Sequence, residues 1–367
     1  MDFTFSSEQD ELRATVDKAL GRHYDLDTRR EISASEAGWS SAVWDRLVDL
    51  GLTAIPFPES AGGLDGSVVD LVAVAERLGA HLVVEPWTAS VVLAGGLLTA
   101  AAQEPSRTSP DVPLAAWTEG VAAGSLRATL GHEEGRGTPD PELVTTVAER
   151  ADGGHTLSGS KRLVLHGDQA DLVLVTARLD ESLALFAVEG PIAGARGYTT
   201  VDGRRAADLH LDATPALLVS AEADRFLAPT LDRALVVLAA EAVGAMGESL
   251  ARTAEYVSTR EQFGKPIGTF QAIAHRLADM KIAYTRARAT LLYTTALAEA
   301  GRLTGRDVSV LKAQVGRLGK QVGESAIQAH GGVGMTDELS IGHLHKRILT
   351  IDAMFGGHDH HTRLLGV

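Results

Sequence analysis

The chain has no cysteine among its 367 residues. Without thiols it cannot form disulfides, thiolate zinc sites or cysteine-ligated iron–sulfur clusters, and a cysteine nucleophile is excluded. It also lacks an excess of basic residues, because 34 Lys and Arg stand against 48 Asp and Glu, a formal net charge of −14. This balance argues against nucleic acids and anionic membranes as main partners, while leaving room for single basic spots that bind phosphate groups.

A long uninterrupted hydrophobic run is missing as well. The most apolar stretch, residues 82–102, is broken by Glu85 and Pro86 and leaves too little apolar length for a membrane span. The first residues, MDFTFSSEQDEL, are acidic and lack the basic and apolar segments of a signal peptide. We therefore expect a cytoplasmic protein that does not span a membrane.

Hydrophobic periodicity divides the chain into three parts. Residues 1–113 have helical spacing, residues 114–222 contain short strand-like runs separated by turn signals, and residues 223–367 return to long helical stripes. We predict a mainly α protein with a central β module. An N-terminal helical domain precedes a small antiparallel β-barrel or sandwich, and a C-terminal four-helix bundle of three long helices and a shorter one follows.

Local signals place individual elements within these parts. Ser6 and Gln9 fit a capping box at the start of a first helix. Further helices are expected at residues 41–50 and 68–78, and the proline-rich residues 103–113 favour a linker.

Two glycine-containing segments could carry chemistry. In REQFGKPIGTFQ, residues 260–271, Arg260 offers a guanidinium fork suited to a phosphate, and Phe263 offers a face for a flat ring. In QAHGGVGMTDE, residues 328–338, the glycines suit either a phosphate or an ordinary helix C-cap. Because they follow a helix rather than a strand, the context is wrong for a Rossmann dinucleotide fingerprint. Taken alone, each segment is also what a polar inter-helix loop looks like.

Taken together, the segments resemble the acyl-CoA dehydrogenase family. A long helix leads into REQFGKPIGTFQAIAHRLADM, and QAHGGVGMTDE follows after a further long helix. The N-terminal half agrees, since LVDLGLTAIPFPESAGGLDGSVVDLVAVAERLGA, residues 47–80, looks like the family's segment with Leu-Gly, Pro-Glu and Gly-Gly pairs. The resemblance spans nearly the whole chain, and the α–β–α order is that family's architecture.

The resemblance implies a flavoprotein oxidoreductase of fatty acid or lipid metabolism that uses FAD and an acyl-CoA substrate. Such proteins remove the α-proton and β-hydride of the thioester and leave an α,β-unsaturated product. They form tetramers in which the adenosine and pyrophosphate half of FAD is gripped by a neighbouring subunit. Asp232 matches a position where relatives contact the CoA portion. The positions that match the FAD contacts are Arg260, Gln262, Phe263, Ile267, Gln271, Gln328, Ala329, His330, Gly331 and Gly332.

The sequence departs from the family at the catalytic base. The chemistry needs a carboxylate near the substrate α-carbon, and the family places a glutamate in one of two positions. The position near the C-terminus corresponds here to Ala353 or Phe355, and the position on the first long bundle helix corresponds to Ala234. An arginine that is common one position later is Leu235 here.

Two carboxylates could substitute for the missing glutamate. Glu241 lies two helical turns after Ala234 on nearly the same face, although its plainer interpretation is a core or interface glutamate paired with an arginine. Asp352 lies beside the vacant C-terminal position, with a shorter side chain.

The β module and the C-terminal histidines depart from the family too. The tryptophan that backs the flavin ring is missing, and Glu133, Glu134 and Arg136 stand in the loop that usually contacts the ring. The segment HDHH, residues 358–361, cannot direct all its side chains at one centre and finds no helical His partner pair, so we predict no metal.

Three functions remain open. The chain is either the non-catalytic subunit of a hetero-oligomeric acyl-CoA dehydrogenase, contributing to FAD held mainly by a catalytic partner, or a self-sufficient homotetramer with Glu241 or Asp352 as base. A relative that uses a flavin for another oxidation is the third. Small residues on the first bundle helix, such as Ala239 and Ala242, suggest room for a bulky acyl group.

Overall fold

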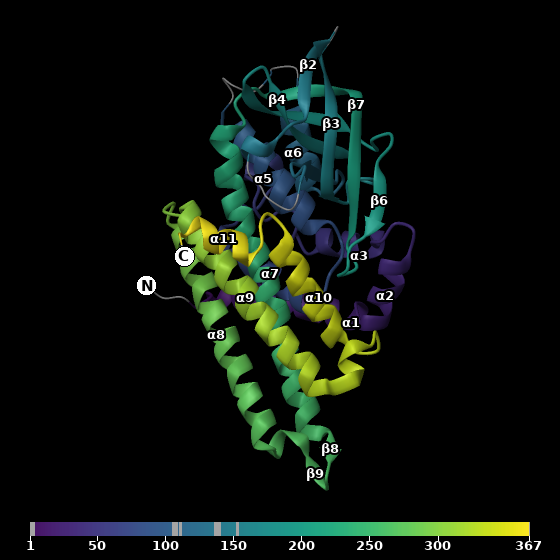
Figure 1. Cartoon of the computed structure of the whole chain (residues 1–367). Helices are drawn as coiled ribbons and strands as arrows, with labels where there is room; N and C mark the ends of the chain where they lie inside the picture. The colour runs from purple at the N-terminus through teal and green to yellow at the C-terminus, as the bar shows by residue number, and fades with distance from the viewer. Residues whose placement is uncertain (1–3, 105–108, 110–111, 136–140, 152–153, 367) are drawn as a thin grey trace. The chain divides into compact units, whose positions relative to one another are not determined.

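The computed structural model describes the chain except for residues 1–3, 105–108, 110–111, 136–140, 152–153 and 367 (Figure 1). The protein is mainly helical with a central β module, as predicted. Two compact units are built from non-contiguous segments: Met1–Glu31, Val68–Val83 and Leu235–Val367 form one, and Ile32–Ser67 with Val84–Ala234 form the other. The division at residues 113 and 222 stays a prediction.

The first unit is helical. Its C-terminal bundle consists of α7 (Asp224–Thr259, from Leu235 onward), α8 (Gln271–Glu299), α9 (Gly305–His330) and α10 (Ser340–Ala353), which lie side by side in Figure 1. A short α11 (His358–Leu364) ends the chain. From the N-terminal half come α1 (Ser7–His23) and α4 (Val68–Ala80). The capping box at Ser6 and Gln9 is confirmed, with both reciprocal hydrogen bonds formed.

Helices α4 and α7 cross in backbone contact. A Cβ added to Gly79 of α4 would lie 1.9 Å from the carbonyl oxygen of Glu241, and one added to Gly244 of α7 would lie 1.8 Å from the carbonyl oxygen of Glu76. Small residues at a helix crossing permit this close approach. The crossing gives Gly244 of α7 a packing role that does not depend on space for a bulky acyl group.

The second unit combines short helices with the β module. Helix α3 (Ser41–Asp49) confirms the expected helix near residues 41–50. The unit also holds a π-helical stretch, η2 (Thr88–Ala94), that continues into α5 (Gly95–Ala102), and α6 (Leu114–Ala122). The first strand-like run expected after the linker, LRATLG at residues 126–131, contains the first strand, whereas the helix at residues 114–122 was not predicted. Most of the predicted linker at 103–113 lies outside the described residues.

Seven strands form one sheet: β1 (Ala128–Gly131), β2 (Val147–Ala151), β3 (Gly154–Leu165), β4 (Leu172–Leu179), β5 (Ser182–Glu189), β6 (Arg196–Thr199) and β7 (Arg205–Ser220). The pairings β4–β2–β3–β7–β5 return to β4, so these strands close a small barrel. Strand β1 lies in line with β2 along the same edge of β4, and β6 lies in line with β5 along the same edge of β7. Closure removes exposed strand edges. Alternate residues such as Leu157, Val173, Phe186 and Leu209 fill its core.

The expected all-antiparallel pairing is wrong at β4. Strands β1 and β2 both run parallel to β4. The hairpin from β2 to β3 reverses the chain, and the chain then returns on the other side of β2, so β4 runs in the direction of β2.

Within the described residues, one helix, α7, has the length and hydropathy to cross a membrane. Because 78% of its most apolar window is buried inside the protein, α7 has the character of a core helix.

Candidate functional site

The segment at 260–271 forms a narrow hairpin between α7 and α8. Two short strands, β8 (Glu261–Gln262) and β9 (Lys265–Pro266), pair with each other, and the amide of Ile267 donates to the carbonyl of Arg260 at 2.8 Å. Phe263 and Gly264 form the turn with φ of 51° and 78°. A positive φ is uncommon for a bulky residue such as Phe263, which is also 91% exposed. Strain together with exposure is typical of a residue that serves a binding function.

The polar side chains predicted to hold the cofactor point to solvent. Arg260, Gln262, Gln271 and Gln328 are exposed. Within the described part of the chain, none of these four side chains forms a hydrogen bond or an ion pair. Ile267 is half-buried behind them. A guanidinium and three amides that have no partner among the described residues are therefore available to a polar ligand.

The segment at 328–332 ends α9 and enters a 3-10 turn, η5 (Gly331–Met335). Gly331 has φ of 65°, and a Cβ built on Gly331 or Gly332 would meet no atom within 4 Å, so the space beside both glycines is open. Ala329 and His330 are buried. The sequence predicts all five residues as contacts, whereas in the structure Gln328, Gly331 and Gly332 are exposed and the other two are buried.

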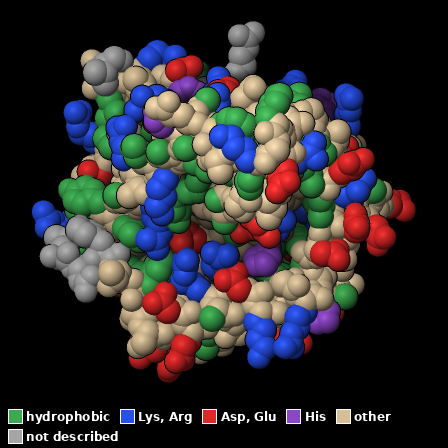
Figure 2. Space-filling view, turned by 90° about the horizontal axis from the view of Figure 1, so that it is seen from below, with side chains coloured by type: hydrophobic (Ala, Val, Ile, Leu, Met, Phe, Trp, Pro, Cys, Tyr) green, Lys and Arg blue, Asp and Glu red, His purple; other side chains and the backbone are tan. Residues whose placement is uncertain are grey.

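An aromatic contact brings the two segments together. The ring of His330 stacks on Tyr256 of α7 with centroids 4.3 Å apart and planes 22° apart. Both segments thus lie at the same end of the bundle, below α7 and α9 in Figure 1. Seen from below in Figure 2, the surface carries many Lys and Arg side chains beside the acidic ones, in spite of the net charge of −14.

These features fit the nucleotide half of FAD. A fork-shaped cation suits the pyrophosphate, open glycine backbone allows a phosphate or ribose to approach closely, and an exposed aromatic face suits adenine. The fit rests on side chains and backbone that are open in the chain itself.

The alternative base Glu241 is engaged elsewhere. Its Oε1 accepts a hydrogen bond from Nη1 of Arg347 at 2.5 Å, and both side chains are buried. Arg347 also donates to the carbonyl of Val83 at 2.9 Å. The plainer interpretation, a core glutamate paired with an arginine, is therefore confirmed by the geometry.

The second alternative base, Asp352, ties the C-terminal helix in place. Its Oδ1 accepts from the backbone amide of His358 at 2.9 Å, and its Oδ2 lies 2.6 Å from Nδ1 of the same residue. Because that amide belongs to the first turn of α11, Asp352 acts as a cap supplied from α10. Nearby, Nζ of Lys312 donates to the carbonyls of Ile351 and Asp352 in the last turn of α10 and to the carbonyl of Met354 just after it.

The last histidine of this segment is structural. His361 is buried, with Nε2 at 3.1 Å from the carbonyl of Phe355 and Nδ1 at 3.2 Å from Oγ of Ser309. Burial, and then the charge of Lys312, lower the pKa of His361 to about 4. Among the residues that the structure describes, no group of three or more His, Asp or Glu side chains could hold a metal ion.

The two usual base positions hold no carboxylate. Ala234 is buried on α7 and is followed by buried Leu235. At the other position, α10 ends at the exposed Ala353, and Phe355 is buried with φ of 53°.

Asp232, the predicted CoA contact, is a half-buried carboxylate on the segment of α7 in the second unit. It has no side-chain hydrogen bond or ion pair to any described residue. Burial raises its pKa to about 6. A lone acid of this kind is expected to meet a polar partner when a ligand is bound.

In the β module, Glu134 turns inward. It accepts hydrogen bonds from Nζ of buried Lys161 at 2.5 Å and from the amide and hydroxyl of Thr146 at 3.0 and 2.5 Å. Burial opposes ionisation, but the hydrogen bonds from Lys161 and Thr146 prevail and lower the pKa of Glu134 to about 2. The sequence predicts Glu134 in the loop beside the flavin ring but does not predict its ion pair with Lys161. Arg136, from the same loop, lies outside the described residues.

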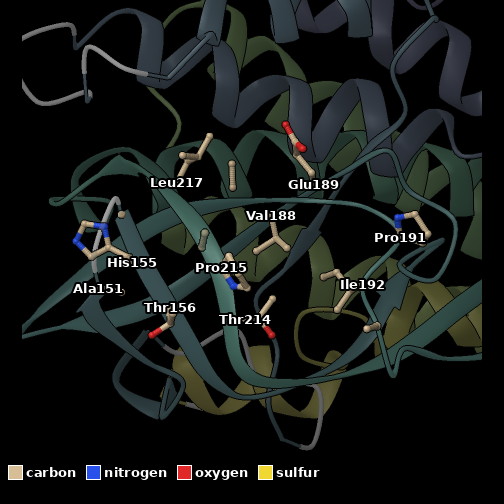
Figure 3. Close-up of a pocket in the computed structure, with 14 residues that line it drawn as sticks. Ala151, His155, Thr156, Val188, Glu189, Pro191, Ile192, Thr214, Pro215 and Leu217 are labelled. Carbon is tan, nitrogen blue, oxygen red and sulfur yellow. The ribbon is translucent and has the colours of Figure 1, made fainter.

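A separate cavity of about 610 Å³ opens in the β module between β2, β3, β5 and β7 (Figure 3). Its lining is largely apolar, and Figure 3 shows His155 and Glu189 on different sides. Its polar side chains do not converge on one point, and none of the predicted site residues lines it.

Comparison with known proteins connects this geometry to one family. The family description "acyl-CoA dehydrogenase, N-terminal domain" matches residues 6–107, and "acyl-CoA dehydrogenase, C-terminal domain" matches residues 226–366. Acyl-CoA dehydrogenase FadE27 of Mycobacterium tuberculosis is 30% identical over 353 residues, which cover 91% of this chain and 90% of the relative. The short-chain-specific acyl-CoA dehydrogenase of Megasphaera elsdenii is 28% identical over 336 residues, 85% of each chain.

Comparison with solved structures leads to the same family. A chain of the ChsE4–ChsE5 complex from Mycobacterium tuberculosis has a TM-score of 0.89 and 27% identity, covering 100% of this chain and 98% of that one. A variant of the Tcur3481–Tcur3483 steroid ACAD has a TM-score of 0.85 and 29% identity, covering 98% and 96%. The chain therefore belongs to the acyl-CoA dehydrogenase family.

Proposed function

We propose that this chain takes part in FAD-dependent α,β-dehydrogenation of an acyl-CoA thioester as one subunit of a complex of two related chains. In this complex it supplies the grip on the adenosine and pyrophosphate half of FAD, and the partner supplies the catalytic carboxylate. Bound FAD accepts the hydride from the β-carbon. The residues of this chain that would hold it are Arg260, Gln262, Phe263, Ile267, Gln271, Gln328 and the backbone at Gly331 and Gly332.

One contrast carries the proposal. The nucleotide loops present polar groups that have no partner in the described part of the chain, whereas the carboxylates near the usual base positions are occupied. Glu241 is neutralised by Arg347, and Asp352 caps α11. A base has to be free to approach the substrate proton, and neither group is.

The relatives support a complex of two chains. Two of the similar structures are named as pairs, ChsE4–ChsE5 and Tcur3481–Tcur3483, and the second is described as a steroid ACAD. We extend both features to this chain, with an acyl-CoA that carries a bulky ring-containing acyl group as the first substrate to test.

Purification tests the division of labour. The chain is produced alone and together with a related subunit that has glutamate at a family base position, and FAD content and acyl-CoA dehydrogenation are measured with short-chain, long-chain and steroid-type thioesters. We expect flavin and turnover only in the complex. A chain that alone retains FAD and reduces it with an acyl-CoA is a self-sufficient homotetramer, and the proposal is then wrong.

The self-sufficient alternative rests on the same two carboxylates. It requires Glu241 or Asp352 to leave its present partner when substrate binds. Glu241→Gln and Asp352→Asn separate this possibility from a purely structural role.

A further inference from the structure

Tyr256 occupies a position from which it can hold the first nucleotide loop. It lies one helical turn before the end of α7, and its carbonyl accepts the amide of Arg260 at 2.8 Å. The carbonyl of Arg260 in turn accepts the amide of Ile267 at 2.8 Å, which closes the hairpin. The backbone of Tyr256 is therefore linked to the start and the return of this loop by two successive hydrogen bonds.

His330 occupies the equivalent position for the second loop. It is the last residue of α9 and directly precedes the open glycines Gly331 and Gly332. Its side chain is only 7% exposed, although Gln328 and both glycines around it are exposed.

A hydrogen bond to its own helix orients the His330 ring. Nδ1 lies 2.9 Å from the carbonyl of Ala326, and because a carbonyl can only accept, Nδ1 carries the proton. On the other side of the loop, the turn approaches the ring's base, since a Cβ built on Gly334 would lie 3.0 Å from Cβ of His330. The imidazole is thus held against its own helix, and the turn that follows passes close to the histidine.

The stacked rings of Tyr256 and His330 join these two anchors. Near-parallel rings 4.3 Å apart leave no room for one helix end to slide toward the other. The sequence separation of the two residues is long, so this contact is a tertiary link between loops that do not otherwise share a hydrogen bond among the described residues.

We infer that Tyr256 and His330 are positioning residues for the nucleotide half of FAD, an inference that rests on the proposed function. The stack sets the spacing between Arg260 and the amides after His330. The side chain of His330, predicted from the sequence as a direct contact, acts through Tyr256 instead.

The test uses the FAD-loaded assembly that the full chain forms. The dissociation constant of FAD is measured by recovery of flavin fluorescence on dilution, and kcat is measured at saturating FAD. Tyr256→Ala and His330→Ala are each expected to weaken FAD binding about three- to tenfold while kcat is kept. The double variant is expected to bind FAD no more weakly than the weaker single variant, because both changes remove one contact.

Conservative changes distinguish positioning from general loss of structure. Tyr256→Phe and His330→Phe keep two stacked rings and are expected to retain FAD within about twofold, whereas Tyr256→Leu keeps apolar bulk without the ring and is expected to lose affinity. His23→Ala, an exposed histidine at the end of α1, serves as the control. If the alanine variants do not fold, the comparison of Tyr256→Leu with Tyr256→Phe decides, and equal FAD affinity in those two overturns the inference.

Arg260→Ala separates this inference from the function on which it rests. Loss of FAD affinity in Arg260→Ala but not in Tyr256→Ala means that the nucleotide site is correctly placed and that the stack has no role in it. Unchanged affinity in Arg260→Ala means that the site itself is wrongly assigned.

Discussion

Nη1 of Arg347 on α10 donates a hydrogen bond to Oε1 of Glu241 on α7 over 2.5 Å, and neither side chain reaches solvent. The pair joins two helices of the bundle, and Arg347 extends the link to the carbonyl of Val83, just beyond α4. This pairing explains why Glu241, two helical turns after Ala234, is buried in the core. Removing one partner of such a pair is costly, because the other charge is left buried without compensation.

Glu241→Gln therefore tests a structural role against a catalytic one. We expect the free energy of unfolding to fall by about 2–3 kcal/mol, because the amide cannot balance the guanidinium charge. Turnover per bound flavin is expected to stay within about twofold of wild type, since Glu241 takes no proton. Urea unfolding and steady-state kinetics of the assembly measure both quantities.

Glu248→Gln is the control for this change. Glu248 lies on the same helix and pairs with Arg252 at a partly exposed position, so its loss should cost less than about 0.5 kcal/mol. A Glu241→Gln protein of normal stability that no longer turns over would identify Glu241 as the base.

Asp352→Asn is expected to loosen the C-terminal helix without stopping the chemistry. The change weakens the charged hydrogen bonds to the amide and Nδ1 of His358, which should cost about 1–2 kcal/mol. Hydrogen exchange of residues 358–364 should report faster local opening. Asp359, seven residues along, is 83% exposed and lies 3.5 Å from Nε2 of His358, so Asp359→Asn should cost less than about 0.5 kcal/mol and change the exchange little. Abolished turnover with unchanged exchange would instead make Asp352 a base.

The contact between α4 and α7 predicts that replacing Gly79 or Gly21 by alanine has opposite effects on stability. Gly79→Ala places a Cβ 1.9 Å from the carbonyl oxygen of Glu241, so the helices must separate, and we expect a loss of at least about 3 kcal/mol or failure to fold. Gly21→Ala in α1 meets no atom within 4 Å and should stabilise the protein by about 0.5–1 kcal/mol. Melting temperatures of the two variants measure the contrast, and similar values would show that α4 does not lie against α7 as described.

The raised pKa of Asp232 predicts that the stability of the protein depends on pH. Burial raises its pKa to about 6 in the folded protein, above the ordinary value of 3.8. Between these two pH values the folded protein keeps a proton on Asp232 that the unfolded chain releases. The stability that protonated Asp232 contributes is therefore fully present below pH 3.8 and is lost as the pH rises through about 6. After allowance for partial solvent exposure, we expect a loss of about 1–2 kcal/mol.

Asp232→Asn removes this dependence. The variant should gain stability over wild type as the pH rises from 4 to 7, and urea unfolding of the assembly across that range measures the difference. A gain that does not change with pH would show that the carboxyl of Asp232 titrates normally.

Much of the fold was predictable because its signals are local. Ser6 and Gln9 mark a helix start within one turn of chain, and the long apolar stripes of α8 and α9 repeat at helical spacing. The parallel placement of β4 was not predictable, because alternation along a strand indicates burial but not the direction of its neighbour. Helix α6 was missed for a related reason, since its short apolar run also fits a strand.

In the candidate site, too, residues within one local motif were predictable and contacts between distant residues were not. Arg260 and Phe263 lie in one contiguous motif, so the resemblance could place them. The ion pair between Glu134 and Lys161 and the stack of Tyr256 on His330 join residues distant in sequence, and only tertiary structure brings them into contact. The pairing of Glu241 with an arginine was foreseen as a type of contact, but the identity of Arg347 was not.

The β8–β9 hairpin has a consequence for how the protein is made. Under the proposed division of labour, Phe263 is shielded only after assembly, and a newly synthesised orphan chain displays this aromatic tip bare to water. An excess of one chain over the other would leave unassembled monomers that expose this ring. Balanced synthesis of the two polypeptides would therefore keep the ring covered.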